Sequence, residues 1–244
     1  MQESQVIIER VRRVGGAIQQ LDIAVDVPQR TVQAGQVFLA RATDSYDPYL
    51  REPWVPIRKR GGTVTVERSV TVTYQPGQVV GFLGPVGKPL LLRETARTLL
   101  LIAFDSTPAA LLMLAEQALN VRVAVALALI GEAQYYPLEA LPPEIEILRG
   151  EDATWQGQRD SIRWADQIVA VAPPPQDRAY YLKLRAAAKD ARGEIAPGYV
   201  LGLFQPPMPC GVGACLACLV RVRGEDVAAC VEGPTFDLAL VSLE

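Results

Sequence analysis

The chain has 244 residues, half of them hydrophobic, which allows one large domain or a few small ones with real cores. Its formal net charge of −3 argues against nucleic acid or another polyanion as the main partner. The sequence contains no histidine, which excludes zinc–histidine catalysis, serine–histidine triads and Rieske clusters. Residues 98–114 are apolar but are interrupted by Asp105 and Pro108, so we expect a strand and a helix there and no membrane span. The N-terminus has no apolar signal core, so we expect a cytoplasmic protein.

Residues 1–92 have the pattern of antiparallel β structure. Short runs rich in β-branched residues alternate partly between apolar and polar positions, and turns rich in glycine and proline separate them. The runs cover residues 6–14, 21–27, 37–42, 64–66 and 70–74. Many short strands with such turns predict a small β-barrel.

Residues 93–197 alternate between apolar runs typical of buried parallel strands and segments of helical character. The strand-like runs are 99–104, 121–130, 144–148 and 167–171, and the helical segments are 108–119 and 176–192. This alternation predicts a Rossmann-like α/β domain. A final strand at 198–204 is expected to lead into the C-terminal segment.

The four cysteines of the chain all lie in that segment, at Cys210, Cys215, Cys218 and Cys230. Three cysteines spaced C-x4-C-x2-C on one loop, with a fourth farther along, are typical of a plant-type [2Fe–2S] site. Glycines between the cysteines let backbone N–H groups approach a cluster. We therefore predict four thiolate ligands to a [2Fe–2S] cluster, and a multidomain α+β fold divided into a barrel (1–92), an α/β domain (93–197) and a cluster module (198–244).

Three other interpretations of the cysteines compete with this one. Structural zinc usually takes two short ligand pairs, whereas here there is one short pair and a glycine-rich gap. Disulfides need an oxidising compartment. Inert buried cysteines would make the regular spacing an accident. Iron–sulfur ligation is favoured over all three.

The cysteines are embedded in two longer motifs, Met208-Pro209-Cys210-Gly211-Val212-Gly213-Ala214-Cys215-Leu216-Ala217-Cys218 and Cys230-Val231-Glu232-Gly233-Pro234-Thr235-Phe236-Asp237. In these motifs the chain resembles the electron-transfer subunit family of dihydroorotate dehydrogenase, which is ferredoxin-reductase-like, as a member or a divergent paralogue. The resemblance implies a flavin barrel, a nucleotide-binding domain and then the cluster module. Three earlier passages resemble the same family: Ala34-Gly35-Gln36-Val37-Phe38, then Asp47-Pro48-Tyr49-Leu50-Arg51-Glu52-Pro53-Trp54-Val55-Pro56-Ile57, and Gly84-Pro85-Val86-Gly87.

The flavin motif of that family is altered here. Its Arg-Pro-x-Ser supplies a cation and a hydroxyl to the FAD pyrophosphate, and this chain has Glu52, Pro53, Trp54 and Val55 at the matching positions. Pro53, Trp54 and Val55 are the candidate FAD-facing residues, although a core position is the alternative for Trp54. Glu52 would repel the diphosphate, and the family's glycine-rich turn is missing at 67–71. These changes argue against FAD binding.

The nicotinamide motifs are altered as well. The family's Gly-Gly-x-Gly-x-x-Pro turn is replaced by Ala103-Phe104-Asp105-Ser106-Thr107-Pro108, and its Cys-Gly-Pro turn by Ala172-Pro173-Pro174-Pro175. Asp105, Ser106 or Thr107 is expected to cap the following helix, using N–H donors that a phosphate would need. We therefore expect no NAD binding.

The sequence predicts an iron–sulfur subunit that relays single electrons and works only within an oxidoreductase complex, because no group for substrate chemistry is evident. Its partner would be a protein that carries a flavin or a second redox centre; by resemblance, this is a catalytic subunit like that of dihydroorotate dehydrogenase. Apolar residues beside the cysteine loop are candidates for the docking face: Phe204, Met208, Val212 and Leu216. Two alternatives stay open: a structural or regulatory subunit with the cluster as a fold staple or sensor, and a complete NADH–FAD–[2Fe–2S] reductase.

Overall fold

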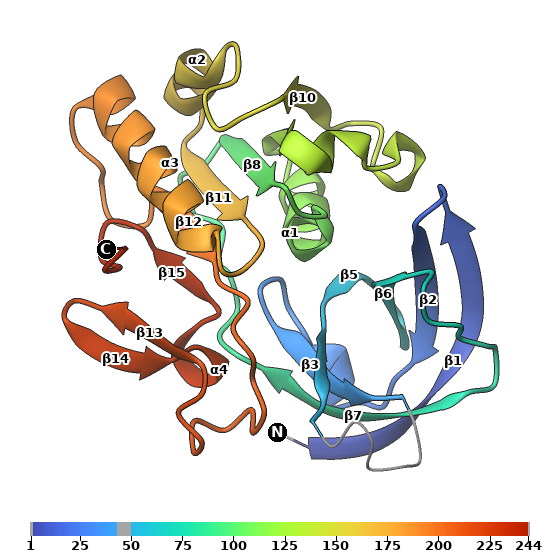
Figure 1. The fold of residues 1–244 in the computed structure, drawn as a ribbon. Helices are drawn as coiled ribbons and strands as arrows, with labels where there is room; N and C mark the ends of the chain where they lie inside the picture. The colour runs from blue at the N-terminus through green and yellow to red at the C-terminus, as the bar shows by residue number, and fades with distance from the viewer. Residues whose placement is uncertain (1, 43–49, 244) are drawn as a thin grey trace.

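The structure is a computed structural model that describes residues 2–42 and 50–243 (Figure 1). Asp47, Pro48 and Tyr49 of the family-like passage lie outside the described residues. Figure 1 shows a barrel, an α/β layer above it and a small C-terminal module beside both. The predicted α+β fold class, with a barrel, a Rossmann-like part and a C-terminal module, is confirmed.

The barrel is an antiparallel sheet with the strand order β4-β3-β7-β1-β2-β6-β5. Its strands are β1 (Gln2–Val14), β2 (Ile18–Ala24), β3 (Val37–Arg41), β4 (Glu52–Trp54), β5 (Pro56–Arg60), β6 (Thr63–Ser69) and β7 (Val79–Val86), with a short 3-10 helix η1 (Gln29–Thr31) between β2 and β3. The two end strands of this order, β4 and β5, are separated in the chain by Val55 alone, so the sheet curls until its ends meet. Apolar residues such as Ile8, Leu21 and Phe82 alternate inward and fill the core.

Two features of the barrel differ from the sequence expectation. Residues 70–74, predicted as a strand, are not one: the chain turns and bends at residues 70–72, where the Thr71 N–H donates to the Ser69 hydroxyl at 3.2 Å. Strands β4, β5 and β7 were not predicted. The run of three basic residues at the end of β5 hides its alternation, since that end of the strand is exposed.

The α/β part is a sheet with the order β10-β9-β8-β11-β12-β15, parallel except for the last pair. Its elements are β8 (Thr98–Phe104), α1 (Ala109–Asn120), β9 (Ala124–Ile130), η2 (Gly131–Tyr135), η3 (Leu138–Ala140), β10 (Glu146–Gly150), α2 (Gln158–Trp164), β11 (Gln167–Val171), α3 (Asp177–Arg192), β12 (Val200–Leu203) and β15 (Thr235–Asp237). The chain winds outward from β8 through β9 to β10, and then returns to the other side of β8 with β11. This is a doubly wound order, and its direction reverses between β8 and β11.

The C-terminal module adds a hairpin of β13 (Leu219–Val222) and β14 (Glu225–Ala228), followed by α4 (Ala229–Glu232). Strands β12 and β15, which flank the cysteine segment in the chain, pair with each other and belong to the α/β sheet. The cysteine segment is therefore anchored at both ends on that sheet. The boundary at 197/198 stays a prediction.

The barrel and the α/β part share one hydrophobic cluster, and polar contacts join them as well. The Tyr136 hydroxyl donates to Glu67 of β6 at 2.6 Å. Glu116 of α1 lies 3.8 Å from Arg58 and 3.7 Å from Arg60, both of β5. Within the described residues, no helix is both long and apolar enough to cross a membrane.

Candidate cluster site and interdomain pocket

The cysteine loop lies between β12 and β13 and turns through two left-handed glycines. Gly211 has φ 67° and Gly213 has φ 76°, a conformation that other residues rarely adopt. A Cβ on Gly213 would also lie 2.9 Å from a methyl carbon of Val231. These turns direct backbone N–H groups at sulfur: Gly213 N lies 3.2 Å from Cys230 Sγ, and Val212 N lies 3.5 Å from Cys210 Sγ. The glycines thus have the role that the sequence predicted for them.

The four cysteines form two pairs that differ in exposure. Cys210, which is half-buried, lies against the exposed Cys215, and Cys230 lies against Cys218 in the core, with Cys210 near enough to act on Cys230. Hydrogen bonds from the backbone of Val212 and Cys215 lower the pKa of Cys210 to about 6. Burial, followed by the neighbouring Cys218 thiol, raises the pKa of Cys230 to about 12. Cys210 is therefore the readily ionised thiol, whereas Cys230 needs a metal to hold it as a thiolate.

Two pairs of thiols suit two irons better than one ion. A [2Fe–2S] cluster takes four cysteines over two metal atoms. Structural zinc needs its four ligands around one point. In residues 2–42 and 50–243, no three histidine, cysteine, aspartate or glutamate side chains converge on one ion position. Four thiols gathered on one loop and on the helix after β14 fit the donor set of such a cluster.

The candidate flavin-facing residues lie in different environments. Trp54 is 1% exposed and packs edge-on against Tyr74 and Phe82 at centroid distances of 5.4 and 5.7 Å, so its ring belongs to the barrel core. Pro53 and Val55 line a cavity of about 70 Å³ that Phe204 and Met208 close from the other side. Pockets that hold small-molecule ligands usually measure about 300 Å³ or more. The cavity is therefore too small for a flavin ring.

The charges around this position do not suit FAD either. Glu52 forms an ion pair with Arg68 of β6, and the Arg68 guanidinium stacks 5.0 Å from the Trp54 ring centre. A diphosphate would have to break that pair while facing the Glu52 carboxylate. The residues present do not fit FAD, and Pro53, Trp54 and Val55 stay an untested assignment.

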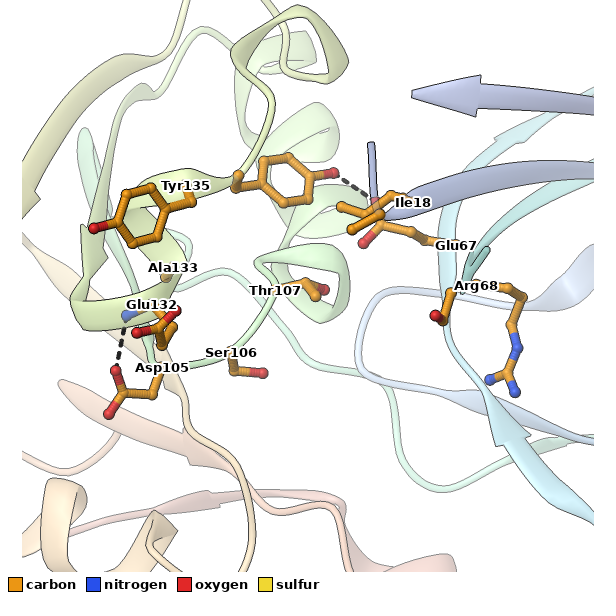
Figure 2. Close-up of a pocket in the computed structure, with 12 residues that line it drawn as sticks. Ile18, Glu67, Arg68, Asp105, Ser106, Thr107, Glu132, Ala133 and Tyr135 are labelled. Carbon is orange, nitrogen blue, oxygen red and sulfur yellow. Dashed lines mark hydrogen bonds between the residues drawn. The ribbon is translucent and has the colours of Figure 1, made fainter. Parts of the chain in front are cut away.

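The altered nicotinamide turn lines the largest pocket described, a cavity of about 530 Å³ between the barrel and the α/β part (Figure 2). Its residues come from the β1–β2 hairpin, β6, the turn after β8 and η2: Ala17, Ile18, Glu67, Arg68, Ser69, Asp105, Ser106, Thr107, Glu132, Ala133, Tyr135 and Tyr136. Figure 2 shows Asp105, Ser106 and Glu132 on one side and Glu67 and Arg68 on the other.

The turn after β8 is held by side-chain hydrogen bonds. Thr107 Oγ1 accepts the Ala109 N–H of α1 at 3.3 Å, so Thr107 has the capping contact that the sequence predicted for one of three residues. Asp105 bonds elsewhere: its Oδ1 accepts the Glu132 N–H at 2.8 Å, and its Oδ2 accepts the Tyr180 hydroxyl. The bond to Asp105 raises the pKa of Tyr180 to about 12.

Sequence reasoning missed the contact between Glu67 and Tyr136. Burial raises the pKa of Glu67, and hydrogen bonds from Tyr136 and Thr107 lower it in part. The two residues are 69 positions apart, and no local motif marks either of them. The charge of this pocket therefore became evident only from the structure.

Comparison with known proteins gives matches for the segment and for the whole chain. Residues 205–242 match the family model for the iron–sulfur cluster binding domain of dihydroorotate dehydrogenase B. The chain is 24% identical to the dihydroorotate dehydrogenase B (NAD(+)) electron transfer subunit of Geobacillus sp. (strain WCH70), with 100% of both chains covered. The same subunit from Desulforamulus reducens is 23% identical, with 85% of this chain and 86% of the relative covered.

Two solved structures have the same fold. One is the NADH-dependent reduced ferredoxin-NADP oxidoreductase, with a TM-score of 0.76, 18% identity, and 97% of this chain and 89% of that chain covered. The other is phthalate dioxygenase reductase, with a TM-score of 0.59, 11% identity, and 90% and 86% covered. The chain has a ferredoxin-reductase-like fold, and its C-terminal segment matches an iron–sulfur cluster binding domain. The resemblance to the electron-transfer subunit family of dihydroorotate dehydrogenase B is thereby confirmed.

Proposed function

We propose that the chain is the iron–sulfur subunit of an oxidoreductase complex and relays single electrons through one [2Fe–2S] cluster. Cys210, Cys215, Cys218 and Cys230 would hold the cluster, which supplies a one-electron redox centre when bound. The observation that carries the proposal is the cysteine loop, whose backbone N–H groups already point at sulfur. Such N–H groups stabilise the reduced, more negative cluster.

The exposed end of the loop supports a docking role. Cys215 is exposed, and apolar side chains surround it: Val212 is 53% exposed and Leu216 is 58% exposed. Phe204 and Met208, the other two candidates, are buried. We infer that a partner with a flavin or second redox centre covers Val212 and Leu216, so that electrons cross near Cys215. A catalytic subunit like that of dihydroorotate dehydrogenase is the proposed partner, because the relatives are electron transfer subunits by name.

Reconstitution with iron and sulfide under anaerobic conditions tests the cluster. The reduced protein should give one S = 1/2 EPR signal with about two irons per chain. Leu216→Ala, between two ligands, should leave iron content unchanged, whereas Cys215→Ser should remove most of it. One zinc per chain and no iron would refute the proposal.

A second candidate function is a structural one, in which the cluster staples the fold. Cys218 and Cys230 are part of the hydrophobic core of the α/β part, which favours this candidate. Rapid reduction of the cluster by a co-purifying flavoprotein would support the relay, and a cluster that no partner reduces would support the staple.

We propose the cytoplasm as the compartment, because the four cysteines are free thiols and such ligands need a reducing environment.

A further inference from the structure

The carboxyl end of β8 lies at the point where the strand order of the α/β sheet reverses. In open α/β sheets, ligands bind in the crevice outside the carboxyl ends of the strands at this point. The pocket of Figure 2 begins at this end of β8, where the residues after β8 and β9 line it, and its volume of about 530 Å³ falls in the range that small ligands fill. Space for a ligand is therefore present, and the chemistry of the lining decides what enters.

Asp105 is the first residue after β8, and its carboxylate ties together the segments that follow three strands. Glu132, whose N–H it accepts at 2.8 Å, comes just after β9. Tyr180, whose hydroxyl it accepts, lies in the first turn of α3, after β11. The Tyr180 ring stacks on Phe104 at 4.9 Å and covers the same end of β8. One side chain thus spans both sides of the crevice.

The backbone around this carboxylate is shaped to receive it. Asp105 has φ 43°, a left-handed conformation that is unfavourable for any residue except glycine and, less so, asparagine or aspartate. Gly131 lies so close that a Cβ there would be 1.9 Å from Asp105 Oδ1. The position of this carboxylate therefore requires a strained backbone at Asp105 and a glycine at residue 131.

We propose that Asp105 determines the charge selectivity of the pocket by acting as a built-in anion. A backbone N–H and a hydroxyl are the donors that a phosphate would use at such a crevice, and Asp105 already occupies both. Any phosphate in the pocket also meets the Glu67 and Glu132 carboxylates. The arginine in the lining, Arg68, is ion-paired with Glu52. The pocket therefore excludes phosphoanhydride ligands by charge.

This selectivity is a property of the chain that goes beyond the electron relay, and it holds whether or not the cluster passes electrons. Its test is ADP binding by calorimetry to the cluster-loaded full chain, with adenosine as the neutral comparison. Asp105→Gly relieves the strain at φ 43° and frees both donors. It should bind ADP more tightly than the unaltered chain by about tenfold or more, the effect of removing one like charge at contact distance near a protein surface. Adenosine binding should change less.

Asp105→Asn keeps the size of the side chain and should show part of the gain, because only the charge is removed. The matched control is Asp190→Asn, which removes the same charge from the last turns of α3, away from Tyr180. It should show no gain. If ADP binds equally to the unaltered chain and to both folded Asp105 variants, or if Asp190→Asn gains as much, the proposal is overturned. If Asp105→Gly does not fold, the comparison of Asp105→Asn with Asp190→Asn decides by the same criterion.

Discussion

The cluster loop and the interdomain pocket both direct backbone N–H groups at negatively charged groups, but they use these donors in different ways. In the loop, left-handed glycines bring the N–H of Gly213 to 3.2 Å from the Cys230 sulfur, where it remains useful when a cluster is bound. In the pocket, left-handed Asp105 takes the Glu132 N–H at 2.8 Å for its own carboxylate. The N–H groups of the loop are arranged for a bound cluster, whereas the N–H group in the pocket is used by the chain's own Asp105 carboxylate. A shared fold therefore does not preserve every site on it.

The largest expected effect is loss of the cluster when an exposed or a buried cysteine of the loop is replaced by serine. Cys218→Ser and Cys215→Ser should both lose most of the cluster, because each removes one of the four proposed thiolate ligands. Only Cys218→Ser should also destabilise the metal-free chain, by about 1–3 kcal/mol, since Cys218 is 1% exposed and a serine hydroxyl there would be buried without a partner. Iron content and urea unfolding measure the two effects.

The exposed Cys215→Ser variant serves as the control for polypeptide stability. If both variants unfold at the same urea concentration as the unaltered metal-free chain, the inner pair is not part of the core that the structure shows. Equal destabilisation of both variants would likewise contradict the difference between the outer and inner pairs.

The next effect is a low rate of NADH oxidation, which tests the flavin and nucleotide positions. With FAD supplied, the reconstituted chain should oxidise NADH with a dye acceptor far below about 1 per second, the low end of typical enzyme rates. A one-electron cluster cannot accept a hydride, the cavity beside Pro53 and Val55 does not suit FAD, and the Asp105 turn does not suit a nicotinamide cofactor. Turnover at ordinary enzyme rates would show that other contacts had replaced the altered motifs.

Sequence reasoning succeeded where the chemistry is local and failed where it depends on distant residues. The iron–sulfur segment was predictable because the cysteine spacing and the glycines lie within one short segment. The replacement of the glycine turn by Asp105 could also be predicted from the sequence. The hydrogen-bond partners of Asp105 could not, since Tyr180 is 75 positions away and follows a different strand. Strand β5 was missed because its exposed basic end interrupts the apolar alternation. The Glu52–Arg68 pair was missed because Glu52 was considered only against a phosphate, and Arg68 lies 16 positions away on another strand.

A smaller effect should follow from removing the hydrogen bond that joins the barrel to the α/β part. Tyr136 is 5% exposed and donates to Glu67 at 2.6 Å. Tyr136→Phe leaves the half-buried Glu67 carboxyl with one donor fewer, so the free energy of unfolding should fall by about 1–3 kcal/mol. Tyr135→Phe is the matched control, because Tyr135 is 76% exposed, and it should unfold like the unaltered chain. Equal stability of both variants would mean that this bond does not hold the two parts together.

The smallest effect is the pH dependence that Glu67 gives to the same contact. Burial raises the pKa of Glu67 above its usual value of 4.5, so the folded chain binds this proton more tightly than the unfolded chain does. The resulting stability is present below pH 4.5 and is lost as the pH rises through the raised pKa. Glu67→Gln has no proton to lose, so its stability relative to the unaltered chain should increase as the pH rises over that interval. Urea unfolding at a series of pH values measures the difference, with the exposed Glu139→Gln as control. Parallel curves for the unaltered chain and Glu67→Gln would show that the carboxyl is solvated, and that the pocket of Figure 2 is less enclosed on its barrel side than the contacts of Glu67 indicate.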